Sequence, residues 1–150
     1  MLLPSQSNNM HESLDAYLTY DHQDTNDHIQ YLLNRKDFLD RTVLHDVLRS
    51  LSRHIFIEEL LLFPKLPESS RDDVEYLERE HMEIMSLLKS TPGSGDELSV
   101  RADLQKLFDI LVEHNSFEES FIYDSFSGMD SASVRQVKDA PKDWKCKFCP

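Results

Sequence analysis

The chain has 150 residues, 39% of them hydrophobic and 29% charged, which is a balance typical of one folded globular domain. It contains only three glycines, and this argues against a many-turned β-sandwich or barrel and against glycine-rich phosphate-binding loops. Sixteen basic and 28 acidic side chains give a formal net charge of -12. A chain this acidic has no general attraction for nucleic acid or for anionic membranes, and we expect neither as a partner.

Residues 1–9 carry neither the basic nor the apolar region of a secretory signal. The longest uninterrupted apolar run, Leu60 to Phe63, is far shorter than the roughly 18 residues that a membrane span needs. The two cysteines, Cys146 and Cys149, are too few for a disulfide framework. Together these features predict a cytoplasmic protein.

Apolar residues recur at helical spacing through four segments, and this periodicity predicts four helices. The second helix is expected to stop at Pro64, because proline cannot donate a hydrogen bond into a continuing helix. The only clear loop composition lies at 90–95, and Gly128 is a plausible cap for the last helix. The expected fold is all-α, an antiparallel up-and-down four-helix bundle over residues 1–128, followed by a tail at 129–150. The predicted helices cover about 11–35, 40–63, 70–89 and 97–126.

Two copies of the pattern H-x-x-x-E-E stand 60 residues apart, in the second and fourth predicted helices. A lone histidine precedes the two copies by 32 and 33 residues, in the first and third helices. Positions i and i+4 share one helix face, so the histidine and first glutamate of each copy can hold one ion together. In an antiparallel bundle these mid-helix positions meet in one layer. The predicted metal ligands are His22, His54, Glu58, His81, His114 and Glu118.

For the neighbouring charged and aromatic residues we expect roles other than metal binding. Glu59 and Glu119 are turned by about 100° from the inner face, so we expect them outside the ligand set. Asp21 and Glu80 are expected to be surface charges. Tyrosines such as Tyr123 are expected to pack at the edge of the core, with a hydrogen bond from one of them to a bound oxygen species as the alternative. His28 remains an alternative to His22 if the helical register differs. The apolar lining of the site is predicted to include Ile57, Leu77, Ile84, Phe117 and Phe121.

On these residues the sequence resembles the hemerythrin-like domains of the HHE cation-binding type, over about residues 11–127. The resemblance implies a four-helix bundle around two non-haem iron ions, bridged by the two glutamates and by an oxo or hydroxo group. The chain lacks the extra histidine and the aspartate found in the oxygen-carrier hemerythrins, which argues against reversible oxygen carriage. Ferritin-type bundles use Glu-x-x-His instead, so that class is disfavoured. Imidazole and carboxylate ligands also suit manganese or zinc.

Four histidines, two bridging carboxylates and one bridging oxygen fill about ten of the about twelve positions around two six-coordinate irons. About two positions then stay open to a small ligand. The first functional hypothesis is therefore binding or sensing of O2 or NO. A di-iron oxidase, a peroxidase, an enzyme protecting against nitric oxide or oxidative stress, and an iron storage or donation protein remain alternatives. The sequence does not decide whether the protein is an enzyme.

The tail ends in C-x-x-C-P, formed by Cys146 and Cys149, and resembles half of a rubredoxin or zinc-ribbon knuckle. A tetrahedral metal site needs four ligands, and one chain supplies two of them. A homodimer joined through these tails would supply all four. A reactive dithiol and a flexible tail without a metal are the other two interpretations.

Overall fold

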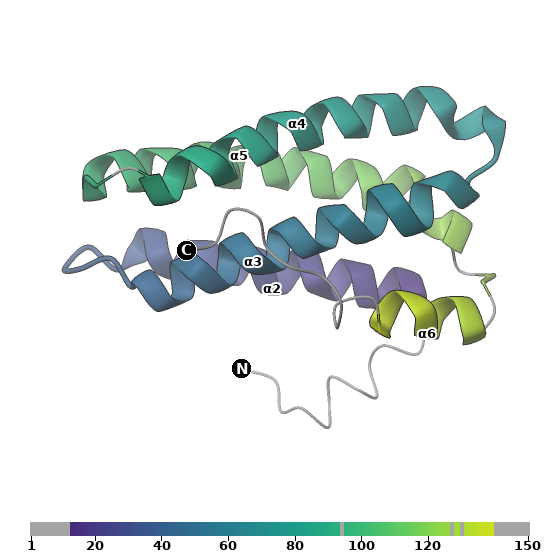
Figure 1. Cartoon of the computed structure of the whole chain (residues 1–150), viewed down its shortest axis with the longest axis horizontal. Coiled ribbons are helices and arrows are strands. Elements are labelled where there is room, and N and C mark those ends of the chain that lie inside the picture. The colour runs from purple at the N-terminus through teal and green to yellow at the C-terminus, as the bar shows by residue number, and fades with distance from the viewer. Residues whose placement is uncertain (1–12, 94, 127, 130, 140–150) are drawn as a thin grey trace.

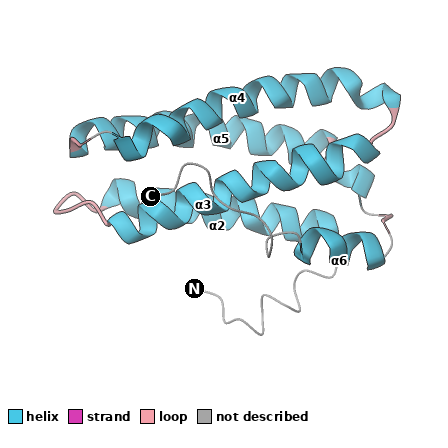
Figure 2. Ribbon diagram, viewed as in Figure 1, coloured by secondary structure: helices cyan, strands magenta, loops and turns pink. Residues whose placement is uncertain are grey.

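The computed structural model describes residues 13–93, 95–126, 128–129 and 131–139 (Figure 1). Every regular element in these residues is helical (Figure 2). Four long helices run up and down side by side, and α2 and α4 each pack against both α3 and α5. This arrangement confirms the predicted all-α bundle. The helices are α2 (Leu14–Asn34), α3 (Arg41–Ile57), α4 (Arg71–Gly93) and α5 (Glu97–Phe121).

Two aspartates begin α3 and α5, which start at the same end of the bundle (Figure 1). The Asp40 carboxylate accepts a hydrogen bond from the backbone N–H of Val43 at 3.2 Å. Asp96 accepts in the same way from Leu98 at 3.1 Å. Each cap satisfies an N–H group that has no partner inside its helix, which fixes where the helix begins.

The third long helix is longer than predicted. A loop was expected from Ser90 onward, but α4 continues to Gly93. The hydroxyls of Ser90 and Thr91 both donate back to the carbonyl of Leu87, at 3.1 and 2.6 Å, and both also lie within hydrogen-bond distance of Asp103 on α5. These bonds hold the end of α4 on α5, so tertiary contacts override the loop composition.

The second and fourth predicted helices are interrupted before their expected ends, which the sequence analysis got wrong. α3 ends at Ile57 and continues as one π-helical turn, η1 (Glu58–Leu62), and a 3-10 turn, η2 (Phe63–Lys65). A second 3-10 turn, η3 (Glu68–Ser70), leads into α4. α5 ends at Phe121 and is followed by a 3-10 turn, η4 (Tyr123–Phe126). The first interruption begins at Glu58 itself and the second comes three residues after Glu118. π turns are frequent at functional sites.

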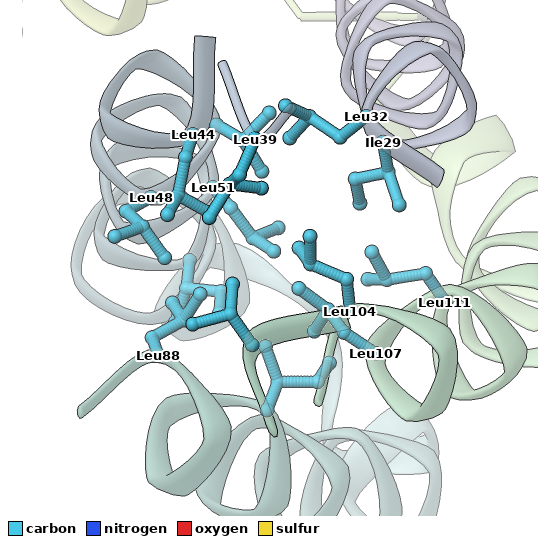
Figure 3. Packing of buried hydrophobic residues seen from close by; sticks show 14 residues of the cluster. Ile29, Leu32, Leu39, Leu44, Leu48, Leu51, Leu88, Leu104, Leu107 and Leu111 are labelled. Carbon is cyan, nitrogen blue, oxygen red and sulfur yellow. The ribbon is translucent and has the colours of Figure 1, made fainter. Parts of the chain in front are cut away.

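The apolar core is divided into two clusters. The larger one lies toward the α2–α3 and α4–α5 connections and is filled by leucines from all four helices, among them Leu32, Leu48, Leu88 and Leu104 (Figure 3). The other lies at the opposite end and includes Leu14, Leu18, Ile57, Leu62, Phe63, Leu77, Ile122, Tyr123, Phe126 and Val137. A layer of polar residues separates them.

A short helix, α6 (Ser131–Asp139), follows the bundle and lies beside one of its ends (Figure 1). Its Val137 is 1% exposed and belongs to the second apolar cluster. Cys146 and Cys149 lie outside the described residues. None of the helices in the described ranges combines the length and the hydropathy that a bilayer span requires.

Candidate metal centre

The six predicted ligands lie together in the polar layer at the middle of the bundle. Each comes from the helix that the sequence assigned to it, except that Glu58 opens the π turn. The four imidazoles are between 1% and 5% exposed, and the two carboxylates are completely buried. Burying this many polar groups is unfavourable unless they have partners, so the layer requires a compensating interaction.

The six residues form two overlapping groups of four, each able to hold one metal ion. The first group is His22, His54, Glu58 and Glu118, and the second group is Glu58, His81, His114 and Glu118. Within each group the donor atoms lie within 4.8 Å of one another. Because Glu58 and Glu118 belong to both groups, each carboxylate is placed to bridge two ions.

The nitrogen and oxygen atoms of these six residues are better satisfied by a cation than by one another. The Nε2 atoms of His81 and His114 face each other at 3.1 Å. The buried oxygens Glu58 Oε1 and Glu118 Oε2 have no hydrogen-bond partner among the described residues. Lone pairs that converge without donors between them are costly in a buried site. A metal ion bound by nitrogen and oxygen ligands would remove this cost.

Each of the four predicted ligand histidines hydrogen-bonds a carboxylate on the side of its ring away from the centre. An ionised carboxylate only accepts hydrogen bonds, so the Nδ1 atom of each ring must donate. This fixes the tautomer and directs Nε2 toward the centre, as is usual for histidines that bind metals. The four bonds are His22 to Glu119 at 2.8 Å, His54 to Asp21 at 2.9 Å, His81 to Glu59 at 2.8 Å, and His114 to Glu80 at 2.9 Å.

The sources of these carboxylates correct one expectation from the sequence. Asp21 and Glu80 were predicted to be surface charges, but they are only 15% and 19% exposed and hydrogen-bond ligand histidines of other helices. Asp21 and Glu80 each stand directly before one predicted ligand in the sequence and hydrogen-bond a different one. Glu59 and Glu119, in contrast, lie outside both groups, as expected. The four bonds tie α2 to α3 and α5, and α4 to α5 and η1.

The buried carboxylates alter the proton affinity of the imidazoles. Burial lowers the pKa of His54, but the charge of Glu58 and hydrogen bonds to Asp21 and Glu58 raise it well above its ordinary value. Burial also lowers the pKa of His81, but its contacts with Glu58 and Glu59 and the charge of Glu118 raise that pKa to about 9. For Glu58, burial favours the neutral acid, but the charge of His54 holds its pKa well below the usual range. The layer therefore attracts positive charge, which protons or metal ions can supply.

Tyr123 is the site residue that the sequence analysis missed. It is 2% exposed, and its hydroxyl lies 2.6 Å from Glu58 Oε2 and 2.8 Å from His22 Nε2. On a continuing α-helix it would point about 140° away from Glu118, so periodicity placed it at the core edge. The end of α5 at Phe121 turns it inward instead. The charges of Glu118 and Glu58 add to burial and raise the pKa of Tyr123 well above its ordinary value.

The other predicted site neighbours divide into two sets. Ile57, Leu77 and Ile84 are completely buried beside the centre. Phe121, predicted to line the site, is 65% exposed at the end of α5, and it packs on Phe117. His28 is not an alternative to His22, since it is half exposed and bonds to the backbone carbonyl of Asp24.

Two hollows in the surface reach the outer edges of the centre. One, of about 350 Å³, is lined by His22 and Glu119 together with residues of α2 and Phe108. The other, of about 290 Å³, is lined by His81, Glu59, Met82, Met85, Ser86 and Lys89. Each of the two groups of four therefore has one histidine that borders the surface.

The comparisons with known proteins agree with this geometry. The family model for the hemerythrin HHE cation binding domain matches residues 11–124. The chain therefore belongs to the hemerythrin HHE cation-binding domain family, and cation binding is its general property. Comparisons with curated proteins and with solved structures gave no match.

Proposed function

We propose that this protein binds two iron ions in the layer of six ligands and that the iron pair binds or senses a small diatomic molecule, O2 or NO. The observation that carries the proposal is the pair of overlapping groups sharing Glu58 and Glu118. Two imidazoles and two shared carboxylates for each ion form a mixed nitrogen and oxygen set that suits a redox-active metal such as iron. Bound iron would supply electrons and an open position for the incoming molecule.

The surroundings of the layer support a small, uncharged ligand. The described side chains above and below it belong to two apolar clusters, so the centre is shielded from bulk water. The two hollows that reach His22 and His81 are open to the surface, so neither encloses a large or charged substrate. O2 and NO need neither a large pocket nor a charged contact. Both gases are small and uncharged enough to pass Met82 and Met85 on the way to His81.

The four outer carboxylates support a stable ligand set. They hold each imidazole with Nε2 toward the centre, and their negative charge makes the nitrogens better donors to a cation. Because Asp21 and Glu80 each bridge to a neighbouring helix, the ligand geometry depends on the bundle as a whole. Such preorganisation favours binding over loose, adventitious metal uptake.

The test is to load the protein with ferrous iron without air, determine iron per chain, and then admit O2 or NO while recording the visible spectrum. A spectrum that changes with the gas and returns when the gas is removed would support binding or sensing. A matched variant, His81→Ala, should bind less iron and respond less. The His45→Ala variant, at a half-buried position outside both groups of four, should behave as the wild type.

Other outcomes would redirect the proposal. Repeated turnover of the gas with an added reductant would favour the oxidase, peroxidase or protective enzyme. An iron content well above two per chain would favour storage or donation. Two bound irons that respond to neither gas would contradict the proposed ligand. A failure to bind iron would contradict the proposed metal.

A further inference from the structure

Tyr123 and Phe63 occupy equivalent positions in the two halves of the chain. The offset of 60 that relates the two H-x-x-x-E patterns also relates these residues, since 123 minus 63 is 60. Each opens a 3-10 turn just after its ligand helix is interrupted. Each ring also stacks on a ligand histidine, Tyr123 on His22 at 5.3 Å and Phe63 on His81 at 5.8 Å. The two halves therefore present similar rings to the centre, and these rings differ by one hydroxyl.

That hydroxyl lies among all four ligands of the first group. Tyr123 Oη is 2.6 Å from Glu58 Oε2 and 3.2 Å from Glu118 Oε1. It is 2.8 Å from His22 Nε2 and 3.1 Å from His54 Nε2. These are the atoms that would surround a metal ion held by the first group. The phenolic oxygen thus stands within reach of the same ion.

Without a bound cation, hydrogen bonding accounts for this arrangement only if the imidazoles carry added protons. A hydroxyl has one proton to donate, whereas four atoms of the first group approach it. Both imidazoles already use their Nδ1–H groups on Glu119 and Asp21, so their neutral forms offer only lone pairs to the hydroxyl. A cation shared by the phenolic oxygen and the four ligands would satisfy all of them together.

Among the described residues, the second group has no such oxygen. Phe63 is 6% exposed and covers His81 with a ring that carries no donor atom. The Nε2 atoms of His81 and His114 instead face each other directly. An ion in the second group would therefore have one protein ligand fewer than an ion in the first group.

We propose that Tyr123 is a fifth protein ligand of the cation in the first group, and that Phe63 leaves the equivalent position on the second cation open for the small external ligand. This inference rests on the proposed pair of iron ions. Of the about two open positions that six ligands leave around two irons, Tyr123 fills one. The two ions are then inequivalent, and exogenous ligands bind on the side of His81 and His114. As with other protein ligands, the phenolic proton is released to solvent when the metal binds.

The direct test is the iron(III)-loaded wild-type protein, examined by visible absorption and resonance Raman spectroscopy after iron per chain is measured. Tyrosine bound to iron(III) gives a charge-transfer band whose excitation enhances tyrosine ring vibrations. We expect this signature with two irons per chain. Two bound irons without it would overturn the inference and leave the proposed iron pair intact. An absence of bound iron would overturn both.

One substitution and its matched control test whether Tyr123 is the tyrosine that binds the metal. Tyr123→Phe keeps the ring and its packing but removes the oxygen, so the tyrosine signature should vanish and the affinity for one of the two ions should fall by about 10- to 100-fold. Tyr31→Phe is the matched control, because Tyr31 is 36% exposed and its hydroxyl bonds to Asp40, away from the centre. A Tyr123→Phe protein that retained the signature would overturn the assignment.

The reverse substitution tests the open position. Phe63→Tyr would give the second group the oxygen that it lacks, so we expect a stronger tyrosine band and at least a tenfold weaker binding of NO to the reduced protein. Phe63→Leu controls for changes in packing and should not add to the band. Unchanged NO affinity in a Phe63→Tyr protein with a strengthened band would overturn the assignment of the open position to the second ion. The wild-type spectrum decides the ligand role of Tyr123 even if this variant does not fold.

Discussion

The Nε2 atoms of His81 and His114 face each other at 3.1 Å in the buried centre of the bundle. Both rings donate outward from Nδ1, to Glu59 and Glu80, so neither neutral ring has a proton to place between the two nitrogens. The site must therefore bind positive charge between these two nitrogens, either as an added proton or as a metal ion. The centre is therefore expected to couple folding to cation binding.

Removal of the metal should lower the stability of the fold. An ion that binds only the folded chain stabilises it by about 3 kcal/mol when its free concentration is 100 times Kd. Thermal unfolding of the iron-loaded protein should therefore occur at a clearly lower temperature after treatment with a chelator. The Glu58→Gln variant should respond much less. Equal unfolding temperatures with and without the two ions would contradict a role of the centre in the fold.

The metal-free protein should lose stability as the pH rises above neutrality. The pKa of His81 is raised from 6.5 to about 9 by its carboxylate partners, Glu58 and Glu59 with the charge of Glu118. A raised pKa stabilises the folded state fully below about 6.5, and this contribution disappears as the pH rises through about 9. The difference corresponds to at most about 3 kcal/mol. Urea unfolding across this range, with a chelator present, measures it.

The control for this pH dependence is His81→Gln, which removes the titrating ring. Its metal-free stability should change less between pH 6.5 and 9. The same steep loss in this variant would assign the effect to groups other than His81. In the iron-loaded protein metal ions replace the protons, so we expect the dependence to be weaker there.

Substitution of a shared glutamate should affect both ions, whereas substitution of a single histidine should affect mainly one. Glu58 belongs to both groups of four, but His114 belongs only to the second. Glu58→Gln keeps the size of the side chain and removes its charge, so iron content should fall from two per chain toward zero. His114→Ala should retain about one iron. Iron analysis of the two purified variants distinguishes these results, and similar losses in both would contradict the bridging arrangement.

The outer carboxylates should set the metal affinity without touching the metal. Asp21→Asn and Glu80→Gln replace the charged acceptors behind His54 and His114 by neutral ones. Removal of such partners typically costs 10- to 100-fold in metal affinity, and we expect a loss of about this size for each variant. Competition with a chelator measures the affinity. Glu83→Gln, an exposed position on α4, is the control and should not change it.

The sequence was sufficient to predict that these six histidines and glutamates lie together, because their spacing repeats. Histidine and glutamate four positions apart share a helix face wherever the helix lies, so His54 with Glu58 and His114 with Glu118 could be paired without a structure. The bundle then follows from four amphipathic segments joined by short connections. Neither inference depends on where a helix ends.

The residues that the sequence misjudged all depend on helix ends or on contacts between helices. Tyr123 points inward only because α5 stops at Phe121. Asp21 and Glu80 look like surface charges along their own helices, but they reach histidines on neighbouring ones. Helical periodicity describes one element at a time, so it carries no information on either effect.

The short helix α6 should contribute to the stability of the bundle through one side chain. Val137 is 1% exposed and packs in the second apolar cluster with Leu14, Leu18 and Phe126. Val137→Ala should therefore reduce the free energy of unfolding by about 1 to 3 kcal/mol, since it removes two buried methyl groups and leaves a cavity. Val112→Ala is a matched control, because Val112 is 48% exposed on α5 and should change stability by less than about 0.5 kcal/mol. Equal effects of the two substitutions in chemical denaturation would show that α6 does not contribute to the core.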